Sequence, residues 1–333
     1  MKFFELIDIQ NLNTQLNALD IVSSAMKMEL FELIESAPLT VSDIAEKVDS
    51  KFDTMMQLID CLNTLGFVTV ANGVVRLSDD WKDEYLSKET FSAFSLLKGA
   101  LQSHKRWQSI PGIARQEGQA EQHEDKMFSS GENLTKYLQS VMDTNRGHAH
   151  ELSTVIAEEI EQAGYSKVAD VAGGHGCYLF EVLNHCPGIT PTLMDLPATL
   201  NVFHALNETN PDKDKVTLLP IDLRKPLNDE IKYDVVMLND LLHSFNRQDK
   251  TAIVRRLMDI LHKDSLLMIS KFDYGAHNLD LDWSLFSMNL HVNSTEGYLE
   301  KNEELEDILA ECQMKIKRTV KIGQKISYFC QFK

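Results

Sequence analysis

Glycines gather directly after a predicted strand in the second half of the chain, in the segment Asp170-Val-Ala-Gly-Gly-His-Gly176. Glycines at a strand-to-helix turn let the backbone pass close to a ligand at the carboxyl end of a sheet. The dinucleotide pattern G-x-G-x-x-G is not met, because a pattern that starts at Gly174 has Leu179 in place of its last glycine. Asp195 ends the next predicted strand, where a carboxylate can bind both hydroxyls of a ribose. The turn and the acid predict a site for an adenosyl ligand without a diphosphate; the alternative is an ordinary strand-to-helix turn.

A histidine, His243, follows the end of a later predicted strand, in the segment Asn239-Asp-Leu-Leu-His-Ser-Phe245. The carboxyl ends of strands are where α/β enzymes place reactive groups. A neutral imidazole near pH 7 is suited to accept a proton from a hydroxyl. The position therefore predicts a general base, and the alternative is one more surface or core histidine among the eleven of the chain.

The elements that must position these residues alternate between strands and helices. Such alternation predicts an α/β fold with a mostly parallel, Rossmann-like sheet covered on both faces. The predicted strands are residues 167–171, 190–195, 216–220, 233–238 and 265–270, with a closing edge pair at 315–320 and 325–332. The predicted helices are residues 178–184, 199–206, 249–262 and 303–311, preceded by a long helix over 134–162.

The first part of the chain has a different pattern, typical of a winged helix. Helices are predicted over 21–34, 44–48 and 53–65, the second of them capped by Thr40-Val-Ser-Asp43. A hairpin follows, with strands 67–71 and 74–77 joined by Asn72-Gly73. Residues 1–89 carry 7 Lys and Arg against 16 Asp and Glu, which disfavours contact with nucleic-acid phosphates. We therefore expect a structural or dimer-forming module.

Bulk properties set the remaining limits. The 333 residues suggest two domains, which we place at 1–105 and 106–333 with a helical linker over 106–165. The net charge of −17 disfavours nucleic-acid and membrane partners. The five scattered cysteines form no C-x-x-C pair, which argues against a disulfide framework and a structural zinc site. The apolar runs are too short to span a membrane, so we expect a cytoplasmic protein. No metal site is expected, because His148 and His150 are two apart and do not share a helix face.

The motifs, taken in order, resemble those of class I small-molecule O-methyltransferases that depend on S-adenosyl-L-methionine. They are Asp170–Gly176, Met194-Asp-Leu-Pro197, Ile221-Asp-Leu223 and Leu242-His243. This family includes plant caffeate-type and acetylserotonin enzymes and bacterial tailoring enzymes of natural-product biosynthesis. The resemblance covers essentially the whole chain, since the family carries an N-terminal winged-helix dimerisation domain. It implies a homodimer that methylates a hydroxyl of a small aromatic or heteroaromatic metabolite in secondary-metabolite biosynthesis, with His243 as the base.

The resemblance also implies which residues surround the cofactor. The glycines would lie against its methionine part, Asp195 would bind its ribose, and Asp222 and Leu223 would flank its adenine. Asp222 could equally be a loop acid in Asp222-Leu-Arg-Lys225. The full expected cofactor set is Asp170, Gly173, Gly174, Gly176, Asp195, Leu196, Asp222, Leu223 and Asn239.

The acceptor pocket is expected to be lined by aromatic, methionine and amide side chains. Met142 could equally be plain core, whereas Asn289, inside an apolar helical run, needs a hydrogen-bond partner. The expected acceptor set is Trp107, Phe128, Tyr137, Met142, Asn145, Phe245, Trp283, Phe286 and Asn289.

Departures from the family pattern leave alternatives open. Ser244-Phe245 stands where the family has Asp-Trp after the histidine, and Leu299 stands where plant enzymes have the glutamate that orients it. Asp240, Asp282 and Glu296 are possible replacements. Methylation of sulfur or nitrogen, which needs no base, is an alternative reaction. A third reading is a regulator whose winged helix binds DNA and whose second domain senses an adenosyl ligand.

Overall fold

The computed structural model describes residues 11–86, 97–98, 100–101, 104, 106–115, 131–275, 281–294 and 296–333. The chain divides into two compact units, residues 1–108 and 109–333, and each is considered by itself. No helix among these described ranges is long and apolar enough to cross a membrane.

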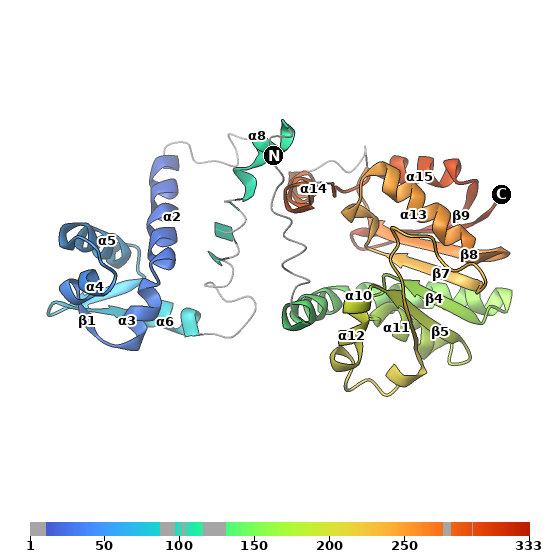
Figure 1. The fold of residues 1–333 in the computed structure, drawn as a ribbon, viewed down its shortest axis with the longest axis horizontal. Coiled ribbons are helices and arrows are strands. Elements are labelled where there is room, and N and C mark those ends of the chain that lie inside the picture. The colour runs from blue at the N-terminus through green and yellow to red at the C-terminus, as the bar shows by residue number, and fades with distance from the viewer. Residues whose placement is uncertain are drawn as a thin grey trace. The chain divides into compact units, whose positions relative to one another are not determined.

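The N-terminal unit is a set of short helices around a small antiparallel sheet (Figure 1). Asn72 and Gly73 both have positive φ, as the predicted two-residue turn requires. Thr40 and Asp43 form the predicted capping box. The elements are α2 Leu12–Lys27, α3 Leu30–Ser36, β1 Leu39–Thr40, α4 Val41–Lys47, α5 Phe52–Thr64, β2 Val68–Ala71, β3 Val74–Leu77 and α6 Asp79–Leu86.

The single helix predicted over 21–34 is wrong. The chain forms two helices, α2 and α3, separated at Glu29, which adopts a left-handed φ of 53°. The break turns Leu30, Phe31 and Ile34 into the core, where Phe31 packs against Trp81 with ring centroids 5.6 Å apart. Tertiary packing therefore decides the break, and apolar spacing along the sequence does not reveal it.

The C-terminal unit has a seven-stranded sheet in the order β6-β5-β4-β7-β8-β10-β9. The first five strands are parallel, and β10 is antiparallel to both β8 and β9. This confirms the predicted α/β fold with a mostly parallel sheet, which follows a helical N-terminal region in the sequence. The strands are β4 Lys167–Val171, β5 Thr190–Asp195, β6 Thr217–Pro220, β7 Tyr233–Asn239, β8 Leu261–Phe272, β9 Met314–Ile322 and β10 Lys325–Phe332.

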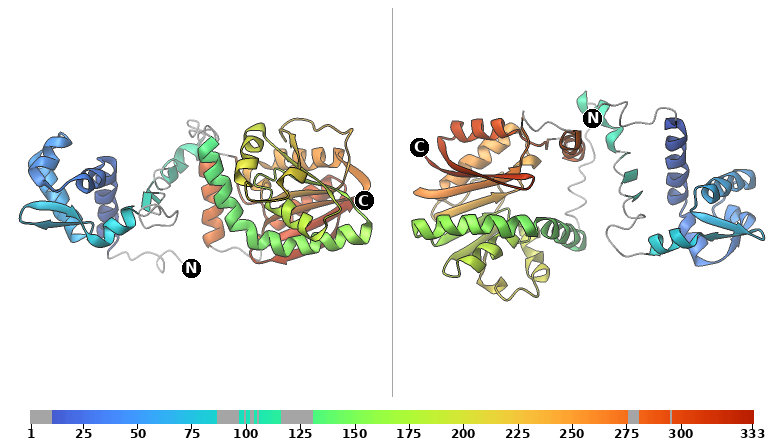
Figure 2. Two further views of the ribbon diagram at one scale, coloured as in Figure 1. Left: turned by 90° about the horizontal axis from the view of Figure 1, so that it is seen from below. Right: turned by 180° about the vertical axis from the view of Figure 1, so that it is seen from behind.

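Helices cover both faces of this sheet, as Figures 1 and 2 show. One buried apolar cluster joins one face to α10, α11 and α12, and a second joins the other face to α13 and α15. The predicted helix over 249–262 ends earlier, because residues from Leu261 onward extend β8. The helices of this unit are α8 Ile110–Ala114, α10 Gly131–Ala163, α11 Cys177–His185, α12 Pro197–Leu206, α13 Arg247–Asp259, α14 Leu281–Ser294 and α15 Asn302–Glu311, with 3-10 turns η1 Lys213–Lys215 and η2 Leu242–Ser244.

Candidate active site

The glycine turn links the end of β4 to the start of α11. Gly174 and Gly176 have φ values of 52° and 76°, which side chains rarely tolerate. At Gly173, an added Cβ would lie 2.6 Å from the carboxylate of Asp170. Asp195 at the end of β5 accepts a hydrogen bond from the Gly174 N–H at 2.9 Å. The turn is therefore held close to two carboxylates at the carboxyl edge of the sheet.

Asp170 is fully buried beneath this turn. Burial raises the pKa of its carboxyl to about 7, and a hydrogen bond from the Asn239 side chain at 3.4 Å partly opposes the shift. Asp170 Oδ2 and Asn239 Oδ1 have no hydrogen-bond partner among the residues that the structure describes. Buried acceptors without a partner are costly, so their presence here indicates a polar ligand group.

A cleft of about 360 Å³ opens beside the turn at the ends of β5 and β6. Its wall combines the carboxylates of Asp195 and Asp222 with several apolar side chains, which suits a ligand that has both a polar sugar and a flat apolar ring. Its lining residues are Ala172, Asp195, Leu196, Ile221, Asp222, Leu223, Arg224, Leu241, Ser244 and Phe245.

The Asp222 carboxylate accepts hydrogen bonds from Arg224 in its own loop. Arg224 donates through its backbone N–H and its Nε to Asp222 Oδ1, each at 3.0 Å, and these contacts lower the pKa of the carboxyl. Lys225 lies 3.7 Å away. Both expected roles of Asp222 are thus compatible with the geometry, because it lines the cleft and also ties its loop together.

His243 lies in the turn η2, just after β7. Burial lowers the pKa of its imidazole, while the carboxylates of Glu300 and Asp240 raise it. Its ring centroid is 5.8 Å from that of Phe272. The net lowering favours the neutral imidazole at pH 7, which is the form that accepts a proton.

A second segment, residues 296–300, supports the loop of His243. The Tyr298 N–H donates to the His243 carbonyl at 2.8 Å. A Cβ at Gly297 would lie 2.8 Å from the same carbonyl oxygen, so only glycine permits this close approach. The loop position therefore depends on backbone contact with a segment far away in the sequence.

Among the acids, Glu300 raises the pKa of His243 the most, and its side chain is buried. Its Oε2 lies 3.0 Å from the Lys250 ammonium, with the two side chains 2% and 0% exposed. The Lys250 ammonium also lies 3.5 Å from the centre of the Tyr298 ring. Of the three acids considered from the sequence, Asp282 and Glu296 are exposed. Glu300 directly follows Leu299 and was not among the acids considered from the sequence; it acts on the pKa of His243 through its charge.

A buried polar network lies behind the glycine turn. Lys325, the first residue of β10, donates to Asn145 at 2.5 Å and to Tyr178 at 3.3 Å, and forms an ion pair with Asp240. His148 contacts the same Tyr178 hydroxyl at 2.9 Å, and burial lowers the pKa of this histidine to about 4. Asp240 therefore pairs directly with Lys325, and its charge also raises the pKa of His243.

Known proteins with similar sequences include O-methyltransferases. The family described as the O-methyltransferase domain matches residues 112–313. The chain belongs to the O-methyltransferase family. Among its relatives, the mitomycin biosynthesis 6-O-methyltransferase of Streptomyces lavendulae is 23% identical and the alignment covers 74% of this chain and 71% of the relative. The flavonoid 7-O-methyltransferase 1A of Mentha piperita is 22% identical, over 73% of this chain and 72% of the relative.

Solved structures of O-methyltransferases share the fold. Human N-acetylserotonin methyltransferase in complex with SAM has a TM-score of 0.59 at 17% identity, covering 100% of this chain and 98% of the human chain. The mitomycin 7-O-methyltransferase MmcR has a TM-score of 0.65 at 18% identity, covering 98% of this chain and 97% of that one. Identities this low show the common fold alone.

The residues expected to line an acceptor pocket are distributed over several places. Trp283 and Phe286 lie with Phe272 in one aromatic cluster, with ring centroids 5.2–6.2 Å apart. Phe272 was not predicted to be near the site, because the strand predicted over 265–270 extends to Phe272 in the structure. Phe245 lines the cleft together with the expected cofactor residues.

The remaining expected acceptor residues have other surroundings. Met142 packs in the core cluster between α10 and α11, and Asn145 is bonded to Lys325. Tyr137 is 43% exposed, and the backbone carbonyl of Asn289 accepts from Asn293. Trp107 belongs to the N-terminal unit, and Phe128 lies outside the described residues. Acceptor roles for these residues stay predictions.

Proposed function

We propose that this O-methyltransferase transfers the methyl group of S-adenosyl-L-methionine to a hydroxyl of a small aromatic or heteroaromatic molecule. The observation that carries the proposal is the cleft at the ends of β5 and β6, where Asp195 and Leu223 meet the loop that bears His243. A polar sugar site, an apolar ring site and a base then share one edge of the sheet.

The residues fit the proposed cofactor. Asp170 Oδ2 and Asn239 Oδ1, which have no hydrogen-bond partner within the described part of the chain, suit the ammonium of its methionine part, and Asp195 suits its ribose hydroxyls. Leu196, Leu223 and Phe245 offer apolar surface for its adenine. When bound, the cofactor supplies a methyl group on an electrophilic sulfonium sulfur.

His243 is the proposed base. The acceptor's hydroxyl oxygen takes the methyl group, and the neutral imidazole takes the hydroxyl proton, so no charge is left on the product. Phe272, Trp283 and Phe286 favour a flat, apolar acceptor, because aromatic rings pack well against such faces. We expect positioning of the two reactants to supply a large part of the remaining rate enhancement.

We further propose that the N-terminal unit forms a homodimer, as in the family. Its helix α2 leaves Leu16 and Leu19 each 46% exposed, one turn apart on the helix. Large apolar side chains exposed together favour a protein partner. The acidic balance of residues 1–89 supports a protein rather than a nucleic-acid partner. Light scattering of the wild type and of Leu16→Glu/Leu19→Glu tests this, and an unchanged mass for the variant contradicts it.

A single experiment tests the methyl transfer. The protein is incubated with S-adenosyl-L-methionine and a panel of hydroxylated, thiol-bearing and amino aromatic compounds, and products are identified by mass spectrometry. We expect methylation of a hydroxyl that falls sharply in His243→Gln. A product methylated on sulfur or nitrogen, with the same rate in His243→Gln, would instead support the alternative reaction. No binding of the cofactor by calorimetry would refute the proposal.

A further inference from the structure

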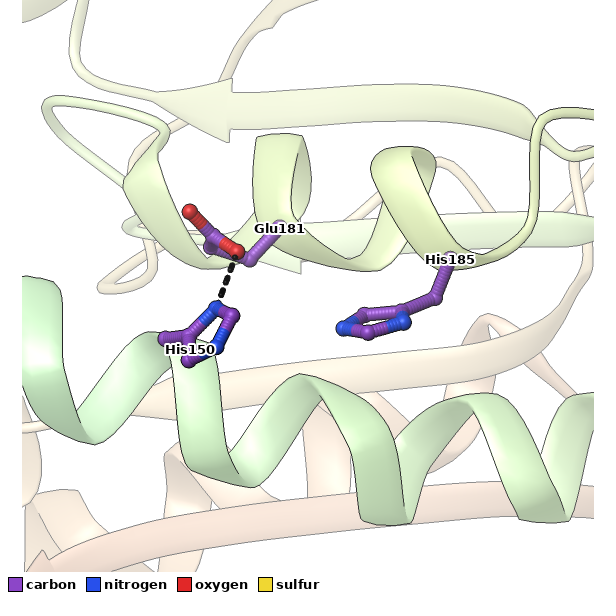
Figure 3. A group of neighbouring side chains, drawn as sticks. All are labelled: His150, Glu181 and His185. Atoms are coloured by element: carbon purple, nitrogen blue, oxygen red, sulfur yellow. Dashed lines mark hydrogen bonds and ion pairs between the residues drawn. The ribbon is translucent and has the colours of Figure 1, made fainter.

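Two histidines and a glutamate converge on the outer surface of the C-terminal unit (Figure 3). His150 comes from α10, whereas Glu181 and His185 come from α11. One ligand atom of each residue lies within 4.8 Å of the others. His150 Nδ1 is 3.1 Å from Glu181 Oε2, and the two imidazole rings are 6.2 Å apart.

The helices hold these side chains on firmly packed backbone. Glu181 and His185 are one turn apart and so share a face of α11. Next to Glu181, Val182 is fully buried, and next to His150, Ala149 is fully buried. The backbone at His150 and Glu181 is therefore anchored by buried neighbours, while their side chains are exposed by 70% and 31%.

The donor set selects a class of ion. Imidazole nitrogens suit zinc, copper and nickel, whereas calcium and magnesium prefer oxygen donors. Ligands of a tetrahedral zinc ion lie about 2.0–2.2 Å from the metal. Zinc binding therefore requires the donor atoms to move closer together, and the side chain of His150, which is 70% accessible, has room to change its rotamer. Two imidazoles and one carboxylate leave a fourth position for water.

The local charge also favours a cation. His185 is the last residue of α11, where the helix dipole presents partial negative charge. The whole chain carries a net charge of −17. The spacing of these residues along the sequence does not predict the cluster, because His150 lies on α10 and the other two ligands lie on α11.

We propose that His150, Glu181 and His185 bind one divalent transition-metal ion of the zinc class, which fastens α10 to α11. The site is separate from the one proposed for methyl transfer. Gly176 caps the start of α11 and His185 ends it, so a helix about 13 Å long lies between them. The ion stabilises the helix pair and takes no part in methyl transfer.

The test uses the untagged full-length protein after treatment with a chelator. Calorimetric titration with zinc chloride should give one ion per chain, and a 100-fold excess over Kd should raise the Tm of the C-terminal unit by roughly 5–11 °C. Cobalt(II) should give a visible absorption spectrum at the same stoichiometry.

Variants separate this site from adventitious binding. His150→Ala and His185→Ala should each weaken zinc binding by at least about tenfold and abolish the cobalt spectrum. His204→Ala removes another exposed histidine, on α12, and should bind zinc as the wild type does. Affinity that is equal in all three variants, or no zinc binding by the wild type, would overturn the proposal. These readouts do not depend on methyl transfer, so they stand or fall separately from the proposed function.

Discussion

The buried pair of Lys250 and Glu300 offers the sharpest test of how the His243 loop is supported. Replacing Glu300 with Gln keeps the size of the side chain and removes its charge. The Lys250 ammonium then stays in a site where it is 0% exposed, beside the Tyr298 ring and the Tyr298 carbonyl oxygen at 3.4 Å, without the carboxylate that directly paired with it. An uncompensated buried charge is strongly destabilising.

The expected cost follows from this enclosure. Breaking a buried ion pair from one side costs about 3–5 kcal/mol, which for a unit of this size lowers Tm by roughly 6–20 °C. The double variant Lys250→Met/Glu300→Gln removes the stranded charge and should regain most of the loss. Glu311→Gln is the matched control, because Glu311 pairs with Arg247 at the surface and should cost no more than about 1 kcal/mol.

The pH dependence adds an independent check. Burial lowers the pKa of Lys250, and Glu300 raises it, so losing Glu300 lowers it further. Between the folded and unfolded pKa values of this lysine, the unfolded chain binds more protons and the free energy of unfolding rises with pH. The Tm deficit of Glu300→Gln should therefore shrink as the pH increases from about 7 towards the ordinary lysine pKa of about 10.4.

The assay is calorimetry of the full chain, in which the transition that moves upward with S-adenosylhomocysteine identifies the C-terminal unit. Equal Tm values for Glu300→Gln and Glu311→Gln would refute the reasoning. So would a double variant that is no more stable than Glu300→Gln alone.

Three further predictions concern the reaction itself. His243→Gln should lower turnover by about 10²–10⁴-fold with unchanged cofactor affinity by calorimetry, and equal turnover in the variant contradicts its role as base. Because burial lowers the pKa of this imidazole, wild-type turnover should persist somewhat below pH 6.5. Asp195→Ala should weaken cofactor binding by about 10–100-fold, through loss of charged hydrogen bonds, and an unchanged Kd argues against the ribose contact. Gly297→Ala should lower turnover about tenfold or more at nearly constant cofactor affinity, since its Cβ would displace the His243 carbonyl 2.8 Å away; wild-type turnover would show that the loop position does not matter.

The order of elements in the C-terminal unit was predictable because each strand and helix carries its own apolar pattern. Asp195 could be placed at the cleft because it ends a strand of the parallel sheet, whereas Leu223 was expected there only from the family resemblance. Glu300, Phe272 and Lys325 were not assigned, because their roles depend on contacts with segments distant in the sequence. Such contacts leave no periodic signal.

The place of β10 inside the sheet has a consequence for biosynthesis. This strand joins β8 to β9, so a nascent chain that has emerged only to residue 322 leaves β8 as an open edge, rich in buried apolar residues. Exposed edges of this kind invite pairing with other chains. Lys325 completes the polar network with Asp240 only when the same strand arrives. Ribosome stalling near this point should therefore yield aggregates rather than a partly active enzyme.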